Sequence, residues 1–189
     1  MTAISDTEKA WLGGGRLHED RAFTPVQIAV LTVSDTRDES NDTSGDVLAA
    51  RVEAAGHTLA GRAIVRDDIE AIRTRIKSWV ASGEVDAIVS TGGTGITGRD
   101  VTPEAVEPLL DKRIEGFSTI FHMLSYQTVG LSTLQSRALA GIIDGVFVFC
   151  LPGSNGAVKD GWDKVIRWQL DSRHGPCNMV ELMPRLKEK

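Results

Sequence analysis

Short apolar runs rich in β-branched residues alternate with longer amphipathic segments through most of this chain. Three runs are nearly continuous in apolar character, as expected of strands covered on both faces: residues 26–34 (VQIAVLTVS), 86–91 (DAIVST) and 146–152 (VFVFCLP). Residues 57–65 (HTLAGRAIV) indicate a further strand. Strands that alternate with helices form right-handed crossovers in a parallel sheet. The pattern therefore predicts a three-layer α/β/α sandwich with a mostly parallel sheet.

The segments between these runs have helical spacing. Residues 67–83 place apolar side chains on one face, begin with acidic residues and end at Gly83. Thr102 is a candidate N-cap, with Pro103 at the first helical position. Helices are predicted at residues 43–56, 67–83, 102–114, 116–130, 132–141 and 154–170.

The length of 189 residues suits one domain of ordinary size, and the chain shows no internal repeat. Residues 1–25 are polar and glycine-bearing, which predicts an extended N-terminal arm followed by a single domain at 26–189. Trp11 and Leu12 are apolar exceptions within this arm. We expect them to dock the arm on a neighbouring subunit.

Charge and cysteine content exclude several classes of protein. A formal net charge of −5 argues against a nucleic-acid binder that works by bulk electrostatics. Cys150 and Cys177 are far apart and form neither a zinc signature nor a disulfide framework. The start lacks a basic region followed by an apolar stretch, and no window approaches the ~18 apolar residues of a membrane span. We therefore expect a cytoplasmic protein with no nucleic-acid partner and no membrane contact.

The loop at residues 90–105 (STGGTGITGRDVTPEA) joins a predicted strand to a predicted helix. Residues 93–98 match the dinucleotide pattern G-x-G-x-x-G, but the required acid about 20 residues on, after a following strand, is missing. The same stretch has Walker A spacing, yet Arg99 and Asp100 stand where Lys and Ser/Thr are needed. Neither nucleotide motif is complete.

The loop can still bind an anion, although it matches neither the dinucleotide motif nor the Walker A motif. Glycines let the backbone turn its N–H groups toward an anion, and a helix start adds positive potential. The expected phosphate cradle is the backbone of Gly92, Gly93, Thr94 and Gly95. Asp100 among such donors indicates either a divalent cation between it and the phosphates or an acid that caps the helix.

Further polar residues follow other predicted strands. Residues 151–158 (LPGSNGAV) place Gly153 and Ser154 between a strand and a helix, either as a second binding loop or as an ordinary turn with a polar N-cap. Ser34 and Asp35 follow the first strand. Because open α/β sheets bind ligands at the carboxyl ends of their strands, we expect these residues on one rim.

Six motifs, in this order, resemble the MoaB/MogA family of molybdenum cofactor biosynthesis: VLTVSD, DTSG, STGGTGITGRDVTPEA, EGF, STLQSRALAG and LPGSNGAV. The resemblance covers residues 26–180, and the EGF spelling at 115–117 and the RHGPCN at 173–178 are closer to MoaB than to MogA. It implies the molybdopterin-binding fold and assembly as a homotrimer or hexamer. It also implies a partnership with a molybdenum insertase.

The activity that the resemblance implies is adenylylation of molybdopterin by ATP, with Mg²⁺ and release of pyrophosphate. The key acid of the family's RD-TPEA motif falls on Asp100, and a second acid of a V-P-D-E motif falls on Asp67. The family serine linked to molybdopterin binding falls on Ser136. Arg66 and Asp68 replace the usual proline and glutamate beside Asp67.

This chemistry needs no general base, because the attacking phosphate is already an anion. Catalysis must come from positioning and charge neutralisation. We therefore expect Asp67 and Asp100 to be the catalytic pair that holds Mg²⁺, while Ser136 and Arg137 grip the second phosphate or the pterin. From the residues alone, Asp67 is better explained as an acid at a helix N-terminus, and the resemblance is what favours a metal-binding role.

Two other hypotheses remain at this level. The chain could hold molybdopterin as a binding or scaffold protein without turnover, in which case Asp67 and Asp100 would be dispensable. It could also belong to the competence-damage relatives of the same fold, whose glycine loop is usually followed by a double acid. The sequence TGRDVTPEA fits that pattern less well.

Overall fold

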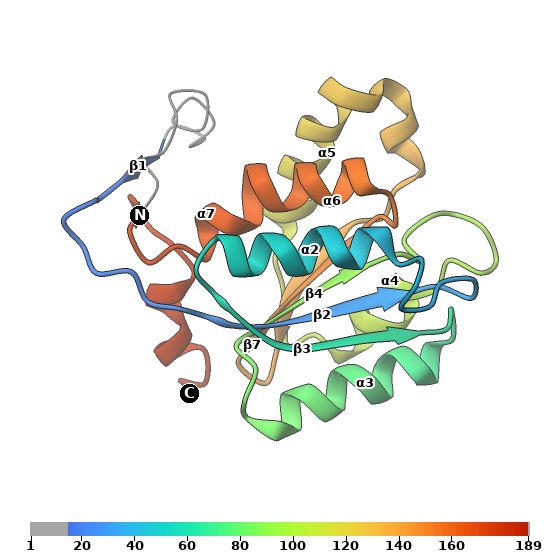
Figure 1. Cartoon of the computed structure of the whole chain (residues 1–189), viewed down its shortest axis with the longest axis horizontal. Helices are drawn as coiled ribbons and strands as arrows, with labels where there is room; N and C mark the ends of the chain where they lie inside the picture. Colours follow the sequence, from blue (N-terminus) through green and yellow to red (C-terminus); the bar gives the residue numbers. More distant parts are fainter. Residues whose placement is uncertain (1–14, 189) are drawn as a thin grey trace.

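The computed structural model describes residues 15–188, which form a layered α/β structure around a six-stranded sheet. Strands β3, β2, β4 and β7 are parallel neighbours, β6 is antiparallel to β7, and β5 is antiparallel to β6 (Figure 1). In sheet order the strands are β3 (Thr58–Val65), β2 (Gln27–Val33), β4 (Ala87–Thr91), β7 (Val146–Leu151), β6 (Leu139–Ile143) and β5 (Lys112–Arg113). The predicted mostly parallel sheet is confirmed.

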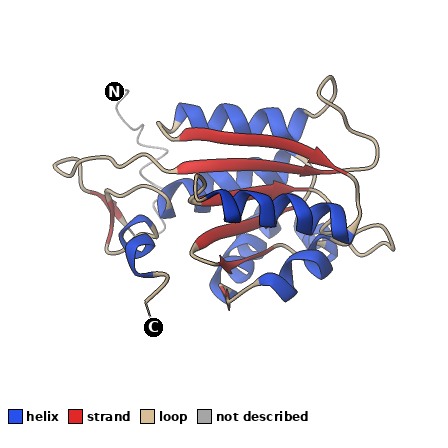
Figure 2. Ribbon diagram, turned by 90° about the horizontal axis from the view of Figure 1, so that it is seen from below, coloured by secondary structure: helices blue, strands red, loops and turns tan. Residues whose placement is uncertain are grey.

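Helices cover both faces of this sheet, as Figures 1 and 2 show. One face packs under α2 (Thr43–Ala54), α5 (Glu115–Val129) and α6 (Asn155–Gly161), and α6 continues through a π-helical turn, Trp162–Ile166, into α7 (Arg167–Gln169). The other face packs on α3 (Ile69–Ser82) and α4 (Thr102–Val106). The two apolar cores lie between these layers, so the three-layer α/β/α prediction is confirmed.

Two predicted helices have different limits in the structure. The segment 132–141 is not a helix: a 3₁₀ turn at Gly130–Gln135 leads into strand β6. Pairing with β7 buries its Leu-Ala-Gly-Ile-Ile stretch, so tertiary contact overrides a weak helical pattern. The helix predicted at 102–114 ends early, because Pro108 follows α4 in a 3₁₀ turn at Glu107–Leu109.

Residues 15–25 of the predicted arm lie along the C-terminal part of the same chain. Strand β1 (Arg16–Leu17) pairs antiparallel with β8 (His174–Gly175), and Thr24 N–H donates to Ser172 Oγ at 2.9 Å. After β8 the chain forms a 3₁₀ helix at Val180–Arg185. Trp11 and Leu12 lie outside the described residues, so docking of the arm on a neighbour stays a prediction, as does the boundary at residue 26.

Among residues 15–188, every helix is too short or too polar to span a lipid bilayer.

His57 lies buried where β3 begins, with 6% of its surface exposed. Its Nδ1 accepts a hydrogen bond from Val26 N–H at 3.2 Å, and its ring centroid lies 5.1 Å from that of Phe23. Burial lowers the pKa of His57 from 6.5 to about 4; the Asp171 carboxylate opposes this shift and the Arg173 cation reinforces it. The folded chain therefore favours the neutral imidazole.

This histidine makes stability depend on pH. The unfolded chain takes up a proton near pH 6.5 but the folded chain only near pH 4, so the stability is complete above pH 6.5 and is lost as the pH falls between these values. Through His57 we expect the free energy of unfolding to drop by about 3 kcal/mol over this range. Urea unfolding of the wild type and His57→Gln, which keeps an acceptor but does not titrate, measures this. Equal pH slopes for both proteins would contradict the prediction.

Candidate functional site

A cavity of about 500 Å³ opens at the carboxyl ends of the parallel strands. Most of the predicted site residues line it: Ser34, Asp67, Gly92, Gly93, Thr94, Gly95, Asp100, Ser136, Gly153 and Ser154. Asp35 and Arg137 are not part of its wall, although both contact residues that are. The fold thus brings segments from five connections of the chain to one hollow.

The glycine loop after β4 is held by contacts that exclude side chains. Gly92 and Gly93 adopt φ values of 109° and 64°, a region that favours glycine. A Cβ atom on Gly92 would lie 2.1 Å from Val33 O, so the backbones approach too closely for any other residue. Thr102 fixes the loop from the other side: its Oγ1 donates to Gly92 O and its N–H donates to Gly93 O, each at 2.9 Å. Thr102 is the first residue of helix α4 and not its N-cap, contrary to the prediction. Val101 is the N-cap, and its side chain makes no capping hydrogen bond.

Asp67 lies directly after β3 and points toward the glycine loop. Its Oδ2 accepts a hydrogen bond from Asp35 N–H at 2.8 Å, and its Oδ1 would lie 3.1 Å from a Cβ on Gly93. Burial raises the pKa of Asp67 above its ordinary value of 3.8, and the negative charges of Asp35 and Asp100 raise it further. The structure therefore holds this carboxylate where its charge is poorly stabilised.

Asp100 lies at the far end of the same loop and is better stabilised. Its Oδ2 accepts hydrogen bonds from Thr97 N–H at 2.8 Å and from Thr97 Oγ1 at 2.6 Å. Burial by itself would raise the pKa of Asp100, but the bonds from Thr97 and Gly95 and the charge of Arg137 hold it below 3.8. The two acids thus share a cavity but differ in electrostatic environment.

Asp35 and Arg99 form an exposed ion pair beside the cavity. Both Nε and Nη2 of Arg99 donate to Asp35 Oδ2, at 2.9 and 2.6 Å. The Arg99 guanidinium is the main reason that the pKa of Asp35 is lowered. Asp35 also positions Asp67 from both sides: its N–H donates to Asp67 Oδ2 at 2.8 Å, and its Oδ1 accepts from Asp67 N–H at 3.3 Å.

Arg137 holds the glycine loop in place through hydrogen bonds to its carbonyl oxygens. Its Nε donates to Gly95 O at 2.7 Å, its Nη2 donates to Asp100 O at 2.6 Å, and its Nη1 pairs with the Glu104 carboxylate. Its own N–H donates to Thr94 O at 2.8 Å. This geometry makes Arg137 a positioning residue in the structure, and the expectation that it grips a ligand phosphate stays a prediction.

Comparison with known proteins shows the family to which the chain belongs. The family described as probable molybdopterin binding domain matches residues 29–172. Molybdenum cofactor biosynthesis protein B of Escherichia coli K12 is 45% identical over 166 residues, which cover 88% of this chain and 96% of that protein. The protein of the same name from Staphylococcus epidermidis is 46% identical over 150 residues, with 77% and 85% covered. The chain belongs to the MoaB/MogA family of molybdenum cofactor biosynthesis proteins.

Solved structures support the same placement within the MoaB/MogA family. A crystal structure of a molybdenum cofactor biosynthesis protein B has a TM-score of 0.77 at 43% identity, covering 79% of this chain and 94% of that one. The tungsten cofactor synthesizing protein MoaB from Pyrococcus furiosus has a TM-score of 0.67 at 38% identity, with 74% and 89% covered. All predicted site residues lie within the 29–172 match.

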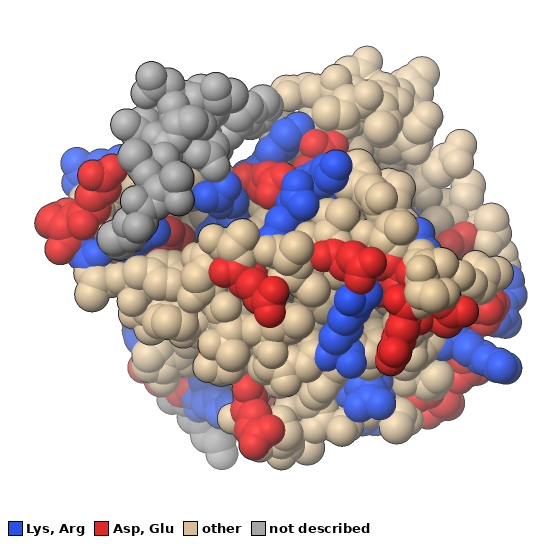
Figure 3. Space-filling model, in the orientation of Figure 1, with Lys and Arg blue, Asp and Glu red and all other residues tan. Residues whose placement is uncertain are grey.

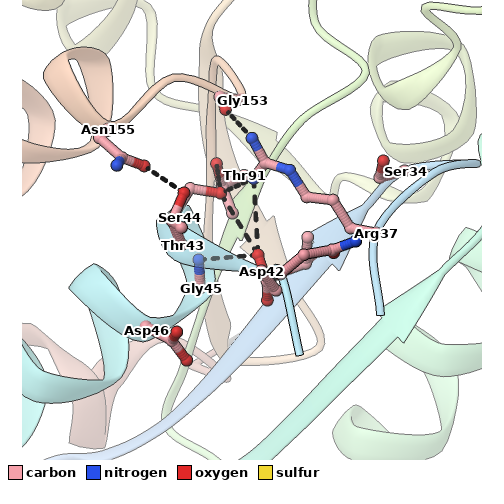
Figure 4. Close-up of polar contacts among 12 residues, drawn as sticks. Ser34, Arg37, Asp42, Thr43, Ser44, Gly45, Asp46, Thr91, Gly153 and Asn155 are labelled. Atoms are coloured by element: carbon pink, nitrogen blue, oxygen red, sulfur yellow. Dashed lines mark hydrogen bonds and ion pairs between the residues drawn. The ribbon is translucent and has the colours of Figure 1, made fainter. Parts of the chain in front are cut away.

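Six residues of the cavity wall of this MoaB-type protein were not foreseen. They are Val33, Thr36, Arg37, Ser132, Gln135 and Pro152. Most are neighbours in sequence of predicted site residues, which is the one signal that could have found them. Figure 4 shows how Arg37 reaches from its loop toward Gly153, across the polar groups at the start of α2.

Charge on the surface of this MoaB-type protein is uneven. Figure 3 shows acidic side chains, with basic ones interspersed, gathered on the side to which β2 and β3 run in Figure 1. Within residues 15–188, no three His, Cys, Asp or Glu side chains are grouped so that they alone could hold a metal ion. Any cation at the cavity therefore needs ligands from a substrate or water as well.

The contrast between the two carboxylates predicts opposite effects on stability. Asp67→Asn removes a poorly stabilised charge and keeps an acceptor for Asp35 N–H, so we expect the melting temperature at neutral pH to rise by about 1–3 °C. Asp100→Asn removes a well-stabilised charge and should lower it. Thermal unfolding in the presence of a chelator measures both. A lower melting temperature for Asp67→Asn would contradict the prediction.

Proposed function

We propose that this protein is a molybdopterin adenylyltransferase, which transfers AMP from ATP to the terminal phosphate of molybdopterin and releases pyrophosphate. The observation that carries the proposal is the cavity wall shared by Asp67, Asp100 and the glycine backbone. Such a wall suits two anionic substrates only if positive charge accompanies them. Membership of the MoaB/MogA family supplies the substrate class.

The donor set at the cavity fits Mg²⁺. This ion is commonly held by one or two carboxylates together with phosphate oxygens and waters, rather than by an all-protein cage. Asp67 and Asp100 line one cavity, and the raised pKa of Asp67 reflects burial first and then charges that a cation would offset. When bound, the metal would neutralise charge on the ATP phosphates and on the leaving pyrophosphate.

The remaining residues of the chain would bind and orient the substrates. Gly92 N–H already donates to Leu151 O at 3.0 Å, and Thr102 donates to the carbonyl oxygens of Gly92 and Gly93. The loop is therefore preorganised, and a phosphate would bind to the backbone N–H groups from Gly93 onward and not to that of Gly92. Thr94 is 2% exposed, and its Oγ1 has no hydrogen-bond partner among the described residues. A buried hydroxyl without a partner is normally satisfied by a ligand or water. Since the phosphate of molybdopterin is already an anion, no residue needs to remove a proton from it.

Product formation tests the proposal directly. The wild type, Asp67→Asn and Asp100→Asn are each incubated with molybdopterin, ATP and Mg²⁺, and adenylylated product is measured by chromatography. We expect both variants to lose about a hundredfold or more of the activity. Asp163→Asn is the matched control, because Asp163 is a carboxylate in an ion pair with Arg51 and is not part of the cavity wall. Full activity of either site variant would remove that residue from the mechanism.

The same experiment separates catalysis from the alternative of a binding or scaffold protein. Tight binding of molybdopterin by the wild type with no adenylylated product would favour that alternative. Under the main proposal, the reaction takes place in the cytoplasm, and the adenylylated product is passed to a molybdenum insertase in the next step.

The protein also presents an apolar face that suits self-association, as the trimers or hexamers implied by its family would require. Residues 116–136 contain no Asp, Glu, Lys or Arg. Figure 1 shows α5 and the turn after it projecting from the body of the molecule. Six exposed apolar side chains lie there: Ile120, Met123, Tyr126, Val129, Leu131 and Leu134. An exposed set of this kind commonly marks a protein interface.

Leu131 and Leu134, which are 70% and 75% exposed, provide the test. We expect a charged residue at either position, in Leu131→Glu or Leu134→Glu, to shift the assembly to smaller species in sedimentation velocity. Leu182→Glu is the control, since Leu182 is 46% exposed but lies in the C-terminal 3₁₀ helix. Unchanged assembly of both variants would place the interface elsewhere.

A further inference from the structure

The polar groups at the start of α2 include one cation that lines the cavity. Arg37 Nη2 donates to Gly153 O at 2.8 Å, and its Nη1 contacts Ser44 Oγ (Figure 4). Its side chain is 26% exposed. Arg37 therefore connects the loop after β2 with the loop after β7, and it forms part of the cavity wall between them.

The buried carboxylate of Asp42 lies beside Arg37, but it does not need the positive charge of Arg37 as a partner. Asp42 is fully buried and accepts hydrogen bonds from Thr32 Oγ1 at 2.7 Å, Gly45 N–H at 3.0 Å and Arg62 Nη2 at 2.9 Å. Arg37 Nη1 is farther away, at 3.5 Å from Asp42 Oδ1. Because Arg62 already supplies a cation within normal hydrogen-bond distance, the charge of Arg37 remains available to another anion.

The cavity is polarised by the position of its charges. Asp67 precedes α3 and Asp100 precedes α4, so both acids lie toward one helical layer. Arg37 contacts the start of α2 and the loop before α6, toward the opposite layer. Of the described residues, Arg37 is the one Lys or Arg in the cavity wall. A phosphate placed between these layers would meet carboxylates on one side and a guanidinium on the other.

We propose that Arg37 is a substrate-binding residue whose guanidinium binds a phosphate group on the α2–α6 side of the cavity. Its Nε has no acceptor among residues 15–188, so the side chain keeps a donor for a ligand while Ser44 and Gly153 hold it in place. A guanidinium fixed in this way is suited to phosphate. The identity of the ligand rests on the proposed function: the phosphate belongs either to ATP or to molybdopterin.

Binding measurements on matched variants test this role. The wild type, Arg37→Met, Arg37→Lys and Arg62→Met are titrated with ATP plus Mg²⁺ and, separately, with molybdopterin, and each melting temperature is recorded. Arg62→Met is the matched control, because it removes the other arginine of Asp42, which lies outside the cavity wall. It reports the structural effect of disturbing Asp42 without removing the proposed phosphate contact.

We expect Arg37→Met to weaken binding of one or both ligands at least tenfold, and the ligand that is affected identifies the phosphate. Arg37→Lys keeps the charge and should weaken that ligand less. Arg62→Met should lower the melting temperature but leave both Kd values within twofold of the wild type. Arg37→Met with both Kd values within twofold of the wild type would overturn the inference. The inference would also be overturned if Arg62→Met weakened binding as much as Arg37→Met, or if the wild type bound neither ligand.

Failure of this inference is distinguishable from failure of the proposed function. A wild type that forms adenylylated product, together with an Arg37→Met variant of unchanged affinity, would refute the role of Arg37 and leave the reaction standing. A wild type that forms no product, but whose affinity for molybdopterin falls in Arg37→Met, would support Arg37 and refute the transfer reaction.

Discussion

The close approach of β2 and β4 at their carboxyl ends determines the geometry of the cavity. Gly92 follows β4 with its Cα so near Val33 O, at the end of β2, that a Cβ would lie 2.1 Å from that oxygen. A second contact of the same kind lies beyond it, since a Cβ on Gly153 would be 3.2 Å from Gly92 Cα. Three strand ends are thus packed backbone against backbone. Side chains from their loops are pushed outward to the rim, where they surround a common hollow.

The electrostatics of this rim favour function over stability. The structure stabilises Asp100 with hydrogen bonds and a nearby arginine but leaves Asp67 half-buried beside two other acids. By contrast, Asp42 is the most buried of these carboxylates, and it is matched by Arg62, Thr32 and a backbone N–H. The charge of Asp42 is neutralised within the chain, and that of Asp100 is stabilised there as well, whereas the Asp67 carboxylate in the cavity is poorly stabilised by the chain itself. Perturbed groups of this kind gather at functional sites.

The sequence predicted the sheet well because its buried strands are nearly continuous in apolar character, as in residues 26–34 and 146–152. The residues on the carboxyl ends of strands followed from the rule for open α/β sheets. Strand β6 was missed because its short, small-residue stretch becomes a strand only by pairing with β7. Arg37 could not be foreseen, since its contact with Gly153 joins residues 116 positions apart. Contacts of that range depend on the folded structure and not on local pattern.

Because β6 runs antiparallel to β7, one wall of the cavity is formed by a segment that precedes a strand, whereas the other walls follow the ends of parallel strands. Leu139, the first residue of β6, pairs with Cys150 near the end of β7, so Ser136 reaches the rim from a segment that enters the sheet rather than leaves it. The turn that carries Ser132 and Gln135 lies outside the parallel strands whose registers set the glycine loops. Insertions or deletions there would reshape one side of the hollow while the opposite side kept its geometry. The shape of the hollow can therefore change at that wall without any change in the backbone packing of the glycine loop after β4.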